Sequence, residues 1–120
     1  MNRTRLFLPA LFLSASALFS IPSYAADQAA DTLAGAALFR DKGCAHCHGE
    51  HLEGTKKGPP LADIRTDKQW TPAKMTSQIM NGGQKMPPFS DSLTDPEIAQ
   101  IVTFLRAKKH PAPPPAAPTN

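Results

Sequence analysis

The sequence predicts a small all-α fold, and two observations support this. Apolar residues recur at helical spacing in three segments, 32–42, 71–81 and from Thr94 onward. The stretch 50–67 is rich in Gly, Pro and charged residues, has no sustained period, and is expected to be an irregular loop with one short turn. We therefore expect three to four helices in a single domain, residues 26–110.

The first helix is expected over 32–42, after a flexible lead at 26–30. Asp31 or Thr32 can cap its start, and Gly43 can close its end in a left-handed conformation. This helix leads directly into the two cysteines of the chain.

The later helices have clearer start signals. Thr71–Pro72 places a proline in the first turn of the second helix, and two glycines follow its end. Thr94 and Glu97 have the spacing of a capping box, and the amphipathic helix that follows is expected to stop by His110.

The motif Cys44–His48 has the form Cys-x-x-Cys-His and contains both cysteines of the chain. This is the pattern of covalent c-type haem attachment. Two thiols one turn apart can add to the two vinyl groups of one porphyrin, and the next histidine is then held beside the iron. We expect one haem c per chain, with thioether bonds to Cys44 and Cys47 and His48 as an axial ligand.

Two other readings of the cysteine pair remain. A redox disulfide of the thioredoxin kind stays open, although no βαβ pattern surrounds the motif. A zinc site lacks a second Cys/His pair, because His51 and His110 are the only histidines outside the motif.

Residues 1–25 have the features of a secretory signal peptide. Arg3 and Arg5 precede an apolar stretch, 6–21, and small residues lead to a cleavage site after Ala25. The expected location is the periplasm, without stable membrane insertion after cleavage. An uncleaved anchor is the alternative, but the apolar stretch is short for a bilayer span of about 20 residues.

Composition limits the expected partners. Without Arg3 and Arg5 the formal net charge falls from +3 to +1, so nucleic acid is not an expected partner. The end of the chain, 111–120, is rich in Pro and Ala and is predicted to be an extended, disordered tail. We expect a monomer.

The second axial ligand has five candidates in the sequence. Met86 is preferred, because two prolines follow it and hold its loop extended, and two glycines precede it. Met75 and Met80 lie on a predicted helix, where methionine usually fills a core. His51 is too near the motif to reach the opposite face, and His110 adjoins the tail.

Several features stand in an order typical of one family. They are Gly35 and Phe39, Cys44–His48, Gly58–Leu61, Met86–Phe89, and a final helix with Phe104–Leu105. In these features the chain resembles the small class I c-type cytochromes over nearly its whole mature length. The resemblance implies the cytochrome c fold, in which the N- and C-terminal helices cross and the helices wrap one haem. Gly35 and Phe39 would then meet Phe104 at the crossing.

The resemblance also implies two further site residues. The carbonyl of Pro59 would accept a hydrogen bond from His48, which fixes the imidazole. Trp70 would donate its indole N–H to a haem propionate. The alternatives are an ordinary turn at Pro59 and a simple pocket wall at Trp70.

The predicted function is electron transfer. With His48 and Met86 both bound, the iron has no open position, so the protein is expected to be a carrier between Fe(II) and Fe(III) and not an enzyme. Its expected partners are a dehydrogenase or quinol-oxidising complex and a terminal oxidase or reductase, bound transiently. An enzyme or sensor in which Met86 dissociates is the alternative. Four lysines form either a docking rim or ordinary solvated positions: Lys42, Lys56, Lys57 and Lys85.

Overall fold

The computed structural model describes residues 24–116, which form four α-helices and one turn of 3-10 helix. The elements are α1 (Tyr24–Asp41), α2 (Cys44–His48), the 3-10 turn (Ile64–Thr66), α3 (Pro72–Asn81) and α4 (Asp95–Leu105). Within this described part of the chain there is no β-strand, so the predicted all-α class is confirmed. The predicted signal peptide lies almost entirely outside the described residues.

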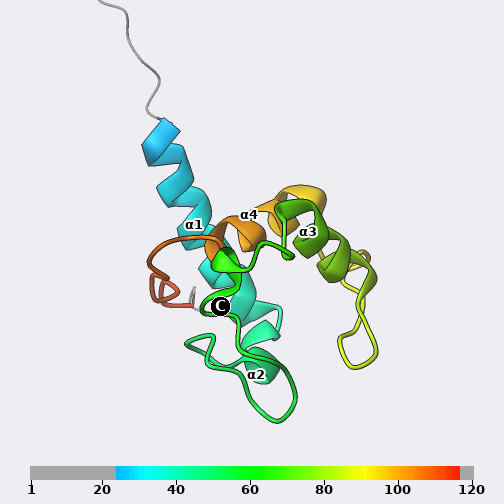
Figure 1. Ribbon diagram of the computed structural model, residues 1–120. Helices are drawn as coiled ribbons and strands as arrows, with labels where there is room; N and C mark the ends of the chain where they lie inside the picture. The colour runs from blue at the N-terminus through cyan, green and yellow to red at the C-terminus, as the bar shows by residue number, and fades with distance from the viewer. Residues whose placement is uncertain (1–23, 117–120) are drawn as a thin grey trace, which may run out of the picture.

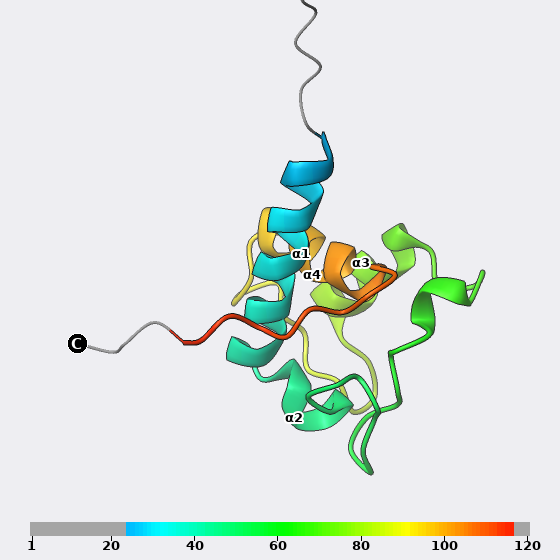
Figure 2. The ribbon, with the colours of Figure 1, turned by 90° about the vertical axis from the view of Figure 1, so that its left-hand side faces the viewer.

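Helices α1 and α4 cross and make the main interhelical contact of the fold (Figures 1 and 2). The crossing is close at Gly35, where an added Cβ would overlap the Gln100 carbonyl and lie 2.8 Å from the Cβ of Phe104. Next to it, the rings of Phe39 and Phe104 pack with centroids 5.6 Å apart. The predicted meeting of these residues is therefore confirmed.

The hydrophobic core lies between α1, α3 and α4 and includes two leucines from the connecting loops. Its buried side chains are Ala36, Phe39, Leu52, Met75, Ile79, Leu93, Ile98, Ile101, Val102, Phe104 and Leu105. Threonine caps fix the starts of the two later helices as the sequence predicts: Thr71 accepts from the Lys74 N–H, and Thr94 and Glu97 form a complete capping box.

One helix boundary differs from the sequence expectation. α1 begins at Tyr24, so the flexible lead expected at 26–30 is wrong. This stretch is rich in alanine, whose high intrinsic helix propensity extends the helix without an apolar face. The structure also contains α2, which is too short to show a period in the sequence. α4 ends at Leu105, within the limit at His110 that the sequence predicts.

The Pro-rich segment returns across α1 instead of pointing away from the domain (Figure 2). It has no regular secondary structure up to Ala116, and the carbonyl of Pro114 accepts a hydrogen bond from the Arg40 guanidinium. The His110 ring packs edge-on against Phe104, with centroids 5.3 Å apart. The last part of the predicted tail, 117–120, lies outside the described residues. Among the residues that the structure describes, no helix is both long and apolar enough to cross a bilayer.

Candidate haem site

The end of α1 places the motif through one glycine. Gly43 has φ of +78°, the left-handed conformation that the sequence predicts at this position, and its N–H donates to the Arg40 carbonyl over 3.0 Å. The chain then turns at once into α2, which carries Cys44, Cys47 and His48. A five-residue helix thus holds all three residues close to the N-terminal helix.

The His48 ring makes one hydrogen bond that defines its tautomer. Its Nδ1 lies 2.8 Å from the carbonyl oxygen of Pro59. Because a carbonyl oxygen only accepts, Nδ1 carries the proton and donates it. The lone pair of Nε2 therefore remains free to bind a metal, and the hydrogen bond raises its basicity.

The loop that supplies Pro59 is fastened to α2 by further hydrogen bonds. The Thr55 hydroxyl donates to the Cys47 carbonyl over 2.6 Å, and the Gly54 N–H donates to the His48 carbonyl over 2.7 Å. A Cβ at Gly58 would lie 2.9 Å from the Cys47 carbonyl oxygen, so glycine permits this close approach. The position of the Pro59 carbonyl is therefore set by several contacts.

A cavity of about 970 Å³ lies between α2, α3 and the connecting loops. All six site residues predicted from the sequence line it, namely Cys44, Cys47, His48, Pro59, Trp70 and Met86. Much of the remaining wall is apolar and includes Leu61, Ile64, Met75, Ile79, Phe89 and Leu105. A large, mainly apolar cavity with two thiols and one free imidazole nitrogen at its wall fits a covalently attached haem.

The five candidates for the second axial ligand separate by their position. Met86 and Met75 line the cavity, whereas Met80, His51 and His110 do not. Met75 is buried in the core on α3, with 2% of the residue exposed. Met86 is half-buried in the loop after α3, where its carbonyl accepts from the Gly83 N–H over 2.8 Å.

Gln78 lines the cavity and is a site residue that the sequence analysis missed. Its side-chain amide donates to the Gly82 carbonyl over 2.9 Å, so it fastens the start of the loop that bears Met86. A single glutamine on a helix gives no sequence signal for such a role. The only sequence signal for a tight loop here was the pair of glycines after the helix. Gly82 has φ of +69°, and an added Cβ would lie 2.5 Å from the Met86 carbonyl oxygen, so this position requires glycine.

Charged side chains also line the cavity, namely Lys42, Lys57, Asp63, Asp67 and Lys85. Burial raises the pKa of the free Cys44 thiol to about 11, so this thiol stays protonated in the folded chain. Lys74 lies over the Trp70 ring, 4.5 Å from its centroid, and Arg106 donates to the Trp70 carbonyl. Within residues 24–116, no three side chains of His, Cys, Asp or Glu lie close enough together to bind a metal ion. The structure of these residues therefore does not support a zinc site.

Comparisons with known proteins agree with this arrangement. The family described as "Cytochrome C oxidase, cbb3-type, subunit III" matches residues 30–105. Cytochrome c6 of Nostoc sp. (strain PCC 7120 / SAG 25.82 / UTEX 2576) is 29% identical over 100 residues, which are 82% of this chain and 89% of that protein. Cytochrome c6 of Rippkaea orientalis (strain PCC 8801 / RF-1) is 32% identical over 82 residues, which are 67% of this chain and 73% of that protein.

A solved structure shares the fold. The KustC0563 c-type cytochrome superposes with a TM-score of 0.54 and 27% sequence identity, covering 60% of this chain and 93% of that one. The predicted cytochrome c fold, with covalently bound haem c, is thus confirmed. The chain is a small single-haem c-type cytochrome and belongs to the family described as "Cytochrome C oxidase, cbb3-type, subunit III".

Proposed function

We propose that this electron-carrying cytochrome works in the periplasm, with haem bound through Cys44 and Cys47 and its iron held by His48 and Met86. Bound haem supplies a one-electron couple between Fe(II) and Fe(III), and histidine with methionine biases its potential upward. In this assignment Pro59 orients His48, and Trp70 donates to a propionate. Residues 1–25 act as the export signal, and 111–120 form a tail that follows the haem domain.

The observation that carries this assignment is the free Nε2 of His48 on a cavity that Met86 also lines. The chain's own contacts hold both residues before any cofactor is considered. Pro59 orients the imidazole, and the Gly83 N–H and the Gln78 amide restrain the loop of Met86.

Thiol chemistry is the weaker candidate for the cysteine pair. A disulfide oxidoreductase needs a thiol whose pKa is lowered, so that the reactive thiolate forms near neutral pH. Burial raises the pKa of the Cys44 thiol to about 11, which is the opposite direction. This favours haem attachment.

Two isosteric variants test the assignment of Met86. Met86→Leu removes the thioether and keeps the volume, so the ferric protein should lose its weak far-red sulfur-to-iron band and its reduction potential should fall. Met75→Leu is the matched control, since Met75 also lines the cavity, and it should retain the band. If both variants retain the band, Met86 is not the ligand; carbon monoxide binding to the reduced wild type would favour the enzyme or sensor reading.

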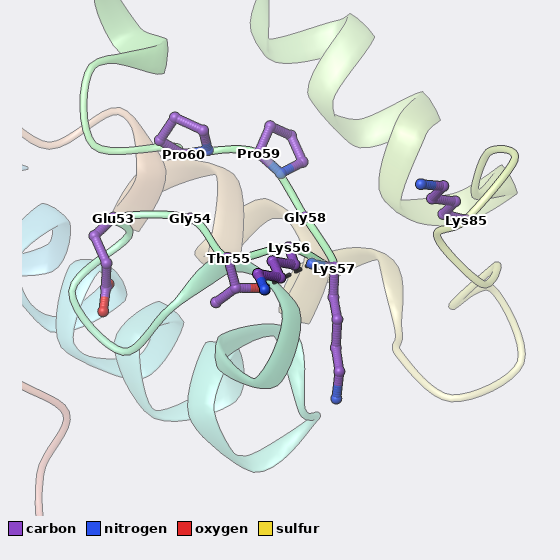
Figure 3. A pocket seen from close by; sticks show the side chains of 9 residues that line it. All are labelled: Glu53, Gly54, Thr55, Lys56, Lys57, Gly58, Pro59, Pro60 and Lys85. Carbon is purple, nitrogen blue, oxygen red and sulfur yellow. Dashed lines mark hydrogen bonds between the residues drawn. The ribbon is translucent and has the colours of Figure 1, made fainter.

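The lysines near the cavity support a docking rim for the redox partner. Lys57 and Lys85 line the haem cavity and also a neighbouring pocket of about 500 Å³, together with Lys56 (Figure 3). Lys42 also lines the haem cavity, and its ammonium donates to the Ser92 carbonyl. None of the four forms an ion pair among the described residues. We propose that they attract a dehydrogenase or quinol-oxidising donor and a terminal acceptor.

Ionic strength tests the rim. The bimolecular rate of electron transfer with a physiological partner should fall as salt rises, because screening weakens steering beyond the Debye length of about 8 Å at 0.15 M. Lys85→Gln should flatten this dependence, whereas Lys108→Gln, on the segment after α4, should not. A rate independent of salt would exclude the rim.

A further inference from the structure

The segment that follows α4 is built from residues that favour an extended backbone. From His110 to Pro115 every residue is either a proline or stands directly before one. Proline fixes its own φ, and it disfavours the α conformation of the residue before it. The unfolded chain therefore samples fewer conformations in this segment, and less entropy is lost when the segment is held in one place. A small number of contacts is then enough to fix it on the domain.

The first contact of this segment is made by His110 at the end of α4. Its Nε2 lies 3.4 Å from the carbonyl oxygen of Leu105, to which it donates. This carbonyl belongs to the last turn of α4, where backbone oxygens have no partner within the helix. The His110 ring also packs on Phe104 with the two ring planes at 73°, which is a favoured edge-to-face arrangement. His110 therefore fastens the segment to the crossing of α1 and α4.

The second contact is made by Arg40 in the last turn of α1. Its Nη1 donates to the Pro114 carbonyl, and its Nε donates to the Asp41 carboxylate over 2.6 Å. A guanidinium has donors on more than one edge, so one side chain can make both bonds. Between the two contacts, Pro111 and Pro113 are half-buried. The segment thus runs from the end of α4 across α1 to the last turn of that helix (Figure 2).

The turn of α1 that the segment holds is the one that precedes the cysteines. The Arg40 carbonyl accepts from the Gly43 N–H, and Gly43 leads directly into Cys44. The closest approach of α1 to α4 is at Gly35, more than one helical turn earlier. A bond at Arg40 therefore restrains α1 at a second place, next to the haem-binding motif.

We propose that residues 107–116 form a strap that closes over α1 and ties its last turn to the end of α4. The strap controls local opening of this end of α1. When its contacts break, the last turn of α1 loosens before the rest of the domain unfolds. This role is conformational, and it does not depend on which residue is the second axial ligand of the iron.

Hydrogen exchange in the haem-loaded protein tests the strap. A chain that ends at Lys109 lacks both contacts, so the amides of residues 38–43 should exchange roughly tenfold faster than in the full chain. The amides of α3 are the internal reference and should exchange as in the full chain. A chain that ends at Ala116 keeps both contacts and is the matched control. Unchanged exchange at 38–43 in the shorter chain, or equal acceleration in α1 and α3, would overturn the proposal.

A double-mutant cycle assigns the effect to Arg40. Arg40→Gln in the full chain should speed exchange at residues 38–43 by roughly fivefold, because it removes a charge-assisted hydrogen bond that is partly exposed. The same substitution in the chain that ends at Lys109 should add little, since its partner is already gone. Asp41→Asn leaves the bond to Pro114 in place and should not speed exchange. Additive effects of Arg40→Gln and the truncation would contradict a shared contact.

The wild-type protein gives an independent measurement if the shorter chain does not accumulate. Ala112 has the only backbone N–H between His110 and Pro114. Its heteronuclear ¹⁵N–¹H Overhauser effect should be close to the values of α4, and proton Overhauser effects should join the rings of His110 and Phe104. A value at Ala112 typical of an unfolded chain would show that the strap is open and would overturn the proposal.

Discussion

The helix crossing and the haem cavity are held together by different means. At the crossing of α1 and α4, direct contact between apolar side chains holds the helices together, and five residues of α4 are buried. Around the cavity, hydrogen-bonded loops make much of the wall, and the loop 49–63 contributes one buried hydrophobic side chain, Leu52. The packing at the crossing therefore involves only side chains of the protein, whereas the cavity side is completed by a large apolar partner inside it.

Loss of the haem should have the largest effect. A Cys44→Ala/Cys47→Ala variant cannot form thioether bonds, and its cavity of about 970 Å³ stays unfilled. The apolar walls of the cavity then face water instead of a porphyrin, and this loss weighs against a whole domain's stability of only about 5–15 kcal/mol. The helical circular dichroism should therefore collapse relative to the haem-loaded wild type. A fully helical variant without haem would show that the crossing alone supports the fold.

Gly35→Ala should have the next largest effect, because its Cβ would meet the Gln100 backbone, which cannot move like a side chain. We expect a loss of about 3 kcal/mol in the free energy of unfolding, measured by guanidinium denaturation of the haem-loaded protein. Gly43→Ala is the comparison, since no atom lies within 4 Å of its Cβ and only the left-handed φ is strained. It should cost about 1 kcal/mol. Equal losses would contradict close packing at the crossing.

The smallest effect concerns the start of α4 and depends on pH. Hydrogen bonds from the backbone N–H and hydroxyl of Thr94 lower the pKa of the Glu97 carboxyl. Its contribution to stability is thus present above the unfolded pKa of about 4.3 and is lost as the pH falls through the lower folded value. The stability difference between wild type and Glu97→Gln should shrink from pH 6 to pH 3. Glu50→Gln, on an exposed loop, is the control, and its difference should change less.

The sequence predicted those helices whose ends carry a chemical signal. Thr71 and Thr94 marked the starts of α3 and α4 correctly, because side-chain caps act within one turn. The start of α1 was missed since alanines extend a helix by backbone preference and leave no apolar stripe. The contact of His110 with Phe104 depends on tertiary packing, so no local sequence signal could predict it.

The residues of the candidate site also fall into those that the sequence predicts and those that it does not. Cys44, Cys47 and His48 follow from one local motif, so their proximity could be predicted. The proximity of Pro59 to His48 was predicted from family resemblance, and the hydrogen bond between them is present in the structure. Gln78 and the ring contact between Phe39 and His48 escaped prediction, because each arises from side chains that the tertiary fold brings together.

The partly buried thiol of Cys44 bears on how the protein matures. A sulfur that adds to a vinyl group must be accessible to the haem and to the enzymes that deliver it. In the closed fold, burial raises the pKa of this thiol to about 11. We therefore expect haem to be attached while the chain is still open, with closure of the domain after it. Folding would then be the last stage of assembly, and we expect chains without haem to be more sensitive to proteases.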